Sequence, residues 1–150
     1  LLYLSSYIDA TRGDYYDLLQ RVRTDGDWAS WLLYFMTGVE RTAQSALRQT
    51  ARLVDLREEL RADLRGKAKP LELVDYLFLN PYITVRRAQA ILGVSDPTAR
   101  NVIATLEAAG VLREVSGRSW GRRYAAEPIL EVLLADEPFD ARPPGAGARG

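Results

Sequence analysis

The chain has 150 residues, 47% of them hydrophobic, which suffices for one medium domain or two small ones. Its 20 basic and 20 acidic residues cancel, and it contains neither cysteine nor histidine. That composition excludes disulfides, the usual zinc, copper and haem ligand sets, and a histidine general base from this chain. No apolar run approaches the roughly 20 residues that span a bilayer, and no signal segment opens the chain, so we expect a cytoplasmic protein without membrane contact.

The first segment predicts packed helices. Leu1–Ala10 is apolar and aromatic, so it must pack against another part of the protein. A helix is expected to start at Gly13-Asp14 and to stop near Asp25-Gly26. Because the first residue is Leu rather than Met, we expect the chain to be part of something longer.

A long helix is predicted from Asp27 to about Arg65, since apolar residues recur there with a 3.6-residue rhythm. At 1.5 Å per residue such a helix would be roughly 58 Å long and would connect two bodies. Its first half, Trp28–Val39, is bulky and aromatic, which predicts burial. Its second half, Glu40–Arg65, is richer in Arg, Gln and Glu, which predicts a solvated or dimer-forming stalk.

Four aromatic residues of this region could in principle form a stacking platform for single-stranded nucleic acid. They are Tyr15, Tyr16, Trp28 and Trp31. Their helical spacing and apolar neighbours favour core packing instead.

The linker Gly66-Lys67-Ala68-Lys69-Pro70 divides the chain. We therefore expect a helical domain over 1–65, a linker over 66–70, a second domain over 71–135 and a disordered tail over 136–150, where Pro, Gly and Ala accumulate. The second domain opens with a helix that begins near Leu71 and ends at Asn80-Pro81.

Two short amphipathic helices follow. Thr84 can cap the first, and Gly93 favours the left-handed conformation that ends it. Ser95 can cap the second, which Gly110 closes. The apolar face of the second helix consists of Ala99, Val102, Ile103 and Leu106. Two strand-like runs separated by Ser116-Gly117-Arg118-Ser119 come next, and a last helix starts at Pro128.

This order of elements, with the spacing LGVS-x-x-TA-x-x-x-I-x-x-L-x-x-AG-x-L, resembles a winged helix-turn-helix. The expected fold is therefore mainly α: N-terminal helices and one long connecting helix, followed by a small α+β winged domain. The resemblance implies binding to double-stranded DNA.

Helical projection places Asn101 opposite the apolar face of the second helix, with Arg100 on one flank and Thr98 and Thr105 on the other. Asn can pair with adenine and Arg with guanine through two hydrogen bonds each. In the wing, basic residues could bind phosphates or enter the minor groove. The candidate DNA-binding residues are Ser95, Thr98, Arg100, Asn101, Thr105, Arg118, Ser119, Arg122 and Arg123.

Other interpretations of the winged segment stay open. Residues 70–126 carry seven basic and five acidic side chains, only a mild positive bias, and Asp96 lies beside the candidate interface. The winged segment could instead dock a protein, including a second copy of the chain. Trp120 could stack on a partner, but the sequence favours a position over the small core. Arg86 and Arg87 could contact the DNA backbone or solvent.

Residues 1–39 resemble the region that follows the catalytic motif in Fic (filamentation induced by cAMP) family proteins. The matching elements are Leu2-Tyr3-Leu4-Ser5 with Tyr7, then Arg12, Tyr15-Tyr16, Leu18-Leu19, Val22-Arg23, Gly26, Trp28, Trp31, Phe35 and Gly38-Val39. A large branch of that family also carries a C-terminal winged helix, which extends the resemblance to about residue 134.

The resemblance implies an AMP-transferase (AMPylation) whose motif has the form His-Pro-Phe-x-x-Gly-Asn-Gly-Arg-x-x-Arg, with the histidine as general base. None of that motif is present in this chain, so no catalytic residue can be assigned. ATP and magnesium would bind an upstream catalytic region, which we expect as a partner. The chain itself is expected to be a non-catalytic C-terminal fragment that needs no cofactor and binds no metal.

Overall fold

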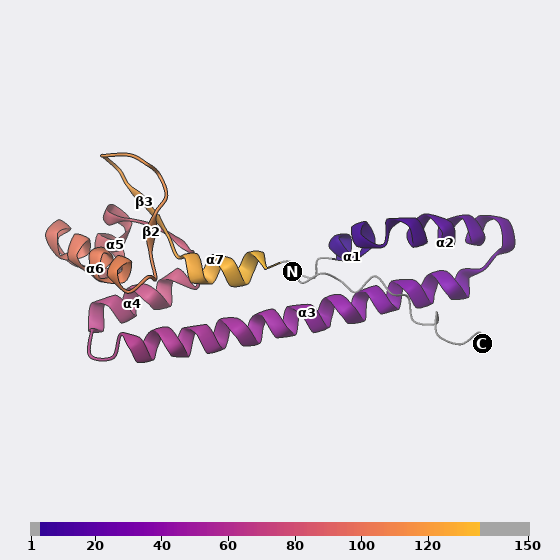
Figure 1. The fold of residues 1–150 in the computed structure, drawn as a ribbon, viewed down its shortest axis with the longest axis horizontal. Helices are drawn as coiled ribbons and strands as arrows, with labels where there is room; N and C mark the ends of the chain where they lie inside the picture. Colours follow the sequence, from indigo (N-terminus) through magenta and orange to yellow (C-terminus); the bar gives the residue numbers. More distant parts are fainter. Residues whose placement is uncertain (1–3, 136–150) are drawn as a thin grey trace. The chain divides into compact units, whose positions relative to one another are not determined.

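The computed structural model describes residues 4–135 and is mainly helical, with one small three-stranded sheet. Figure 1 shows the order of elements along the chain. The structure separates into two compact units, one built on residues up to Arg48 and the other spanning Gln49–Ala135. The boundary falls within one continuous helix, α3 (Trp28–Asp63), whose ends confirm the long-helix prediction to within two residues.

The first unit contains α1 (Leu4–Ala10), α2 (Arg12–Asp25) and the first part of α3. Thr11 joins α1 to α2: its Oγ1 donates to the Tyr7 carbonyl at 2.7 Å and lies 2.7 Å from the Tyr34 hydroxyl. Gly26, with φ 68°, ends α2 in the left-handed conformation. The predicted helix thus starts one residue earlier than expected and ends where expected.

Tyr7 is the buried aromatic residue of this unit, with 3% of its surface exposed. Its ring lies against the backbone of Gly38 in α3, where a Cβ would come within 2.5 Å of the ring. The Tyr34 ring packs 5.3 Å away, between ring centres. The prediction that the N-terminal segment packs against another element is therefore confirmed for its described part, and residues 1–3 lie outside the described residues.

The predicted burial of the aromatic half of α3 is wrong for this chain. Trp28 is 60% exposed and Tyr16, on α2, is 56% exposed, while Tyr15 and Trp31 are half-buried. The rings pair with one another rather than with a core: Trp31 stacks on Phe35, with ring centres 5.5 Å apart. Helical periodicity aligns apolar residues on a face, but it does not show whether another element covers that face.

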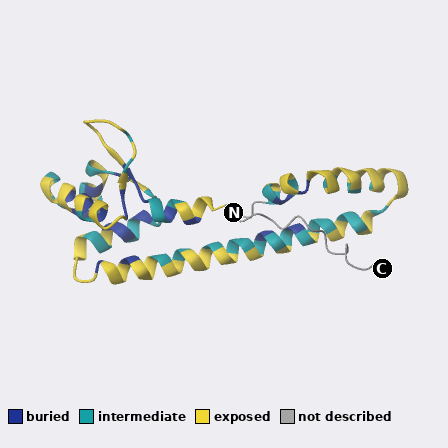
Figure 2. Ribbon diagram, viewed as in Figure 1, coloured by how far each residue is buried: buried dark blue, intermediate teal, exposed yellow. Residues whose placement is uncertain are grey.

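The second unit holds all the other buried hydrophobic side chains among residues 4–135. Most of the buried positions in Figure 2 lie on its elements. Its helices are the end of α3, α4 (Ala68–Leu77), α5 (Val85–Leu92), α6 (Asp96–Ala108) and α7 (Glu127–Leu134). Its core includes Leu73, Leu77, Ile103, Leu106 and Ile129. Leu60 and Leu64 join that core, so the last turns of the expected solvated stalk are instead packed.

The sheet consists of β1 (Tyr82–Thr84), β2 (Arg113–Glu114) and β3 (Arg123–Ala125), in the antiparallel order β1-β3-β2. Thr84 lies opposite Arg123 in the β1–β3 pair. β2 and β3 confirm the two predicted strands. β1 was not predicted, although its β-branched and aromatic residues were a signal for it.

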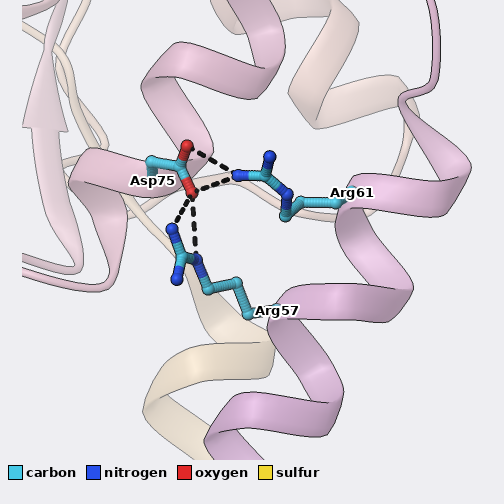
Figure 3. A network of polar contacts seen from close by, with 3 residues as sticks. All are labelled: Arg57, Arg61 and Asp75. Atoms are coloured by element: carbon cyan, nitrogen blue, oxygen red, sulfur yellow. Dashed lines mark hydrogen bonds and ion pairs between the residues drawn. The ribbon is translucent and has the colours of Figure 1, made fainter.

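Polar contacts join α3 to α4 and to α7 in the second unit. Asp75 of α4 accepts hydrogen bonds from Arg57 and Arg61 of α3, with N–O distances of 2.8–3.0 Å (Figure 3). Burial alone would raise the pKa of Asp75, but the two guanidinium groups outweigh it and the pKa lies below its ordinary value. In the same unit, the side-chain amide of Gln49 in α3 donates hydrogen bonds to the backbone carbonyls of Val132 and Leu133 in α7. Carbonyls in the last turn of a helix have no partner within the helix.

Candidate nucleic-acid interface

The two helices α5 and α6 form the framework of the candidate site. Thr84 caps α5, since its Oγ1 accepts a hydrogen bond from the Arg87 backbone N–H at 3.2 Å. Gly93, with φ 61°, ends α5 in the left-handed conformation, as predicted. The three residues Gly93–Ser95 then carry the chain into α6, and the apolar faces of both helices meet in the core.

The faces of α6 are those that helical projection predicted. The four apolar residues Ala99, Val102, Ile103 and Leu106 are buried. On the other side Thr98, Arg100 and Asn101 are exposed, and Thr105 is half-buried. The Asn101 amide makes no hydrogen bond to any described residue, so it is available to an adenine edge.

Three candidate hydroxyl residues, Ser95 just before α6 and Thr98 and Thr105 on it, already have local partners. The Ser95 side chain makes no capping bond, contrary to expectation, because its Oγ lies 3.0 Å from the Thr98 hydroxyl. The Thr105 hydroxyl donates to the Asn101 carbonyl at 2.9 Å. The hydroxyls of Thr98 and Thr105 can therefore still accept a hydrogen bond from a ligand, but each is already oriented by its local partner.

Arg100 is held by Asp96, one turn earlier on the same helix. The Arg100 Nε lies 2.5 Å from Asp96 Oδ1. The hydrogen bond and the charge of Asp96 raise the pKa of the Arg100 guanidinium. To bind guanine, Arg100 must exchange this carboxylate for the base, so Asp96 opposes the proposed contact.

The loop between β2 and β3, residues 115–122, is fixed at its base. The Glu114 carboxylate accepts hydrogen bonds from the backbone N–H groups of Ser116 and Gly117, at 2.7 and 3.1 Å, and from the Ser116 hydroxyl. These bonds, those of Ser116 first, lower the pKa of Glu114. Ser116 Oγ in turn accepts from the Arg123 backbone N–H at 3.2 Å, so both ends of the loop are joined.

The far part of the loop is exposed. Arg118, Ser119 and Arg122 are all on the surface, and the Arg122 Nε donates to the Arg118 carbonyl at 3.2 Å. Trp120 is 91% exposed. It therefore does not cover the core, which was the interpretation that the sequence favoured.

A hollow brings part of the candidate set together. It lies among the first turns of α5 and α6 and the loop, and is lined by Thr84, Val85, Arg86, Gln89, Asp96, Arg100, Ser119, Trp120, Gly121 and Arg122. Of the nine predicted residues, Arg100, Ser119 and Arg122 meet there, whereas Ser95, Thr98, Asn101, Thr105, Arg118 and Arg123 lie outside its lining. Gln89 was missed, although its spacing of three from Arg86 places both on one face of α5.

Residues 4–135 contain no group of three acidic, His or Cys side chains that could hold a metal ion. None of the described helices is both long and apolar enough to cross a membrane. Comparison of the chain with known protein families finds no matching family.

Proposed function

We propose that residues 71–135 form a winged helix-turn-helix that binds double-stranded DNA. In this proposal α6 enters the major groove, and the β2–β3 loop contacts the adjacent backbone or minor groove. The observation that carries it is the hollow between α5, α6 and the loop, where three arginines from three elements, Arg86, Arg100 and Arg122, meet beside the exposed face of α6.

The chemistry of each surface fits its role. Asn101 is exposed and uncommitted, as a bidentate adenine contact requires. Arg118, Arg122 and Arg123 are exposed on the loop and at the start of β3, where they can neutralise phosphates. Small residues on the outer face of α6, such as Ala104 and Ala108, leave room for the helix to approach the bases.

The test is a duplex titration across a salt series of about 50 to 200 mM, read by anisotropy of a labelled random-sequence duplex. Replacing Arg118, Arg122 and Arg123 together by Ala should reduce the slope of log affinity against log salt by up to about 2.7, since each phosphate contact contributes about 0.9. The matched control removes three exposed arginines elsewhere, Arg23, Arg52 and Arg65. It should leave the slope unchanged. Absence of binding by the wild type at the lowest salt would refute the proposal.

The same proposal makes the chain the non-catalytic C-terminal region of a Fic-like protein. The support is the set of motif residues in 1–39, two of which, Tyr7 and Gly38, pack against each other. A catalytic region that binds ATP and magnesium would belong upstream. Incubation of this chain with labelled ATP should give no AMP transfer to itself or to added protein, and measurable transfer would overturn the assignment.

A protein-interaction or dimerisation module is the second candidate. It is favoured by an apolar hollow on the sheet side of the second unit, where Tyr82, Val115, Leu130 and Leu134 line one surface. Light scattering, together with the duplex titration, distinguishes the two candidates. A dimer that shows no affinity for duplex DNA at low salt would favour the interaction module.

A further inference from the structure

Trp120 is the most exposed large apolar side chain in the described part of the chain, at 91%. Water contact over a whole indole ring is unfavourable, and no described element packs over it. Tryptophan in such a position is characteristic of a contact surface, because the ring supplies a large apolar area with few rotatable bonds. The β2–β3 loop therefore presents an unpartnered aromatic group.

The loop that carries Trp120 is held in place. Its base is closed by the bonds from Glu114 and Ser116, and Gly117 and Gly121 adopt the left-handed conformation at φ 61° and 64°. Ordering the loop on binding thus requires little further loss of conformational freedom. Trp120 is presented to a partner from a fixed base.

The charges around Trp120 specify the partner. Arg118 and Arg122 flank it in the loop, and with Arg122 it lines the hollow that reaches Arg100. An anionic partner with flat aromatic groups matches this combination, because arginines bind phosphates while an indole stacks on bases. A lipid surface offers the anions but no flat ring, and a protein pocket for Trp needs no cluster of arginines.

We propose that Trp120 contacts nucleobases of the bound DNA, entering the minor groove as an apolar wedge that partly unstacks one base step. This inference rests on the proposed function and adds to it a contact that neutralises no phosphate. Base steps that unstack easily, such as TA, would then be preferred where the loop meets the groove.

The test compares Trp120→Ala, Trp120→Phe and the triple arginine variant, as full-length chains, against the same random-sequence duplex. Trp120→Ala should weaken binding about tenfold with an unchanged salt slope, because the indole displaces no counterions. Trp120→Phe should retain most of the affinity, since a smaller ring still stacks. The wild-type tryptophan fluorescence should be quenched by DNA, and Trp120→Phe should lack that change.

Two results overturn the inference in different ways. If Trp120→Ala binds as tightly as wild type while the triple arginine variant loses salt dependence, Trp120 contacts no base and the DNA-binding proposal stands. If wild type binds no duplex at low salt, the proposed function fails and this inference fails with it. Because Trp120 is exposed, Trp120→Ala and Trp120→Phe should melt at the wild-type temperature, which excludes unfolding as the cause of their lost affinity.

Discussion

Replacing Gly38 by alanine should destabilise the first unit, even though alanine is the better helix former. A Cβ at Gly38 would lie 2.5 Å from Cδ1 and 2.6 Å from Cε1 of the Tyr7 ring. Those distances fall about 0.9 Å short of ordinary van der Waals contact, so the ring or the helix must move. Tyr7 is buried and packed against Tyr34, which leaves it little room.

Two opposing effects determine how much Gly38→Ala changes the free energy of unfolding. Overpacking of a filled site costs about 1–3 kcal/mol, and exposing part of the Tyr7 ring adds to that cost. The helix propensity of alanine over glycine returns about 1 kcal/mol. The net expectation for Gly38→Ala is a loss of about 1–2 kcal/mol in the free energy of unfolding.

Gly13 provides the matched control. It lies in the first turn of α2, and nothing stands within 4 Å of a Cβ added there. Gly13→Ala should therefore stabilise the chain by about 0.5 kcal/mol through propensity alone. Both variants are measured by thermal unfolding, followed through tryptophan fluorescence, because Trp28 and Trp31 lie in the same unit.

A Gly38→Ala variant that is as stable as wild type, or more stable, would show that the added Cβ meets no clash with the Tyr7 ring. A double variant tests the cause directly. Combining Gly38→Ala with Tyr7→Ala should remove the penalty of the first substitution, because the clashing ring is gone, and the two effects should be strongly non-additive.

Two charge substitutions test the second unit. Asp96→Asn should tighten duplex binding by about fivefold, because it releases Arg100 to pair with guanine, whereas Glu107→Gln on the same helix should do less. Asp75→Asn should lower the free energy of unfolding by about 1 kcal/mol at neutral pH, a value discounted because the ion pairs are partly exposed. Since the folded pKa of Asp75 is lowered, its contribution is present above the unfolded value of about 3.9 and is lost as the pH falls through the folded value. The stability gap between wild type and Asp75→Asn should therefore close in acid, and a gap independent of pH, or an equal loss in Asp63→Asn, would contradict the assignment.

The sequence predicted elements best where local chemistry decides the backbone. Thr84 and Gly93 fix the two ends of α5 through a cap and a left-handed residue, and neither depends on distant contacts. The buried residues of α6 follow from their spacing for the same reason. Ser95 failed as a cap because Thr98 offered its hydroxyl a competing partner, which residue type alone does not reveal.

Burial was harder to predict, because it depends on what covers a face. The periodicity around Trp28 correctly indicated a helix, but it could not show that this face is left open in the described chain. The exposure of Trp120 was missed in the same way, since a tryptophan near a small core suggests packing. The hollow near Arg122 also escaped prediction, because it is assembled by the sheet register and not by any one segment.

The position of Thr84 limits where residues can be inserted into the second unit. It is at once the last residue of β1, the partner of Arg123 in the sheet, and the cap of α5, with no connecting loop between strand and helix. A residue inserted between Thr84 and Val85 would rotate α5 by about 100° or shift the strand by one position, which reverses its faces. Residues inserted near Trp120 would only lengthen the loop. The reach of the loop can thus vary independently of the orientation of α6.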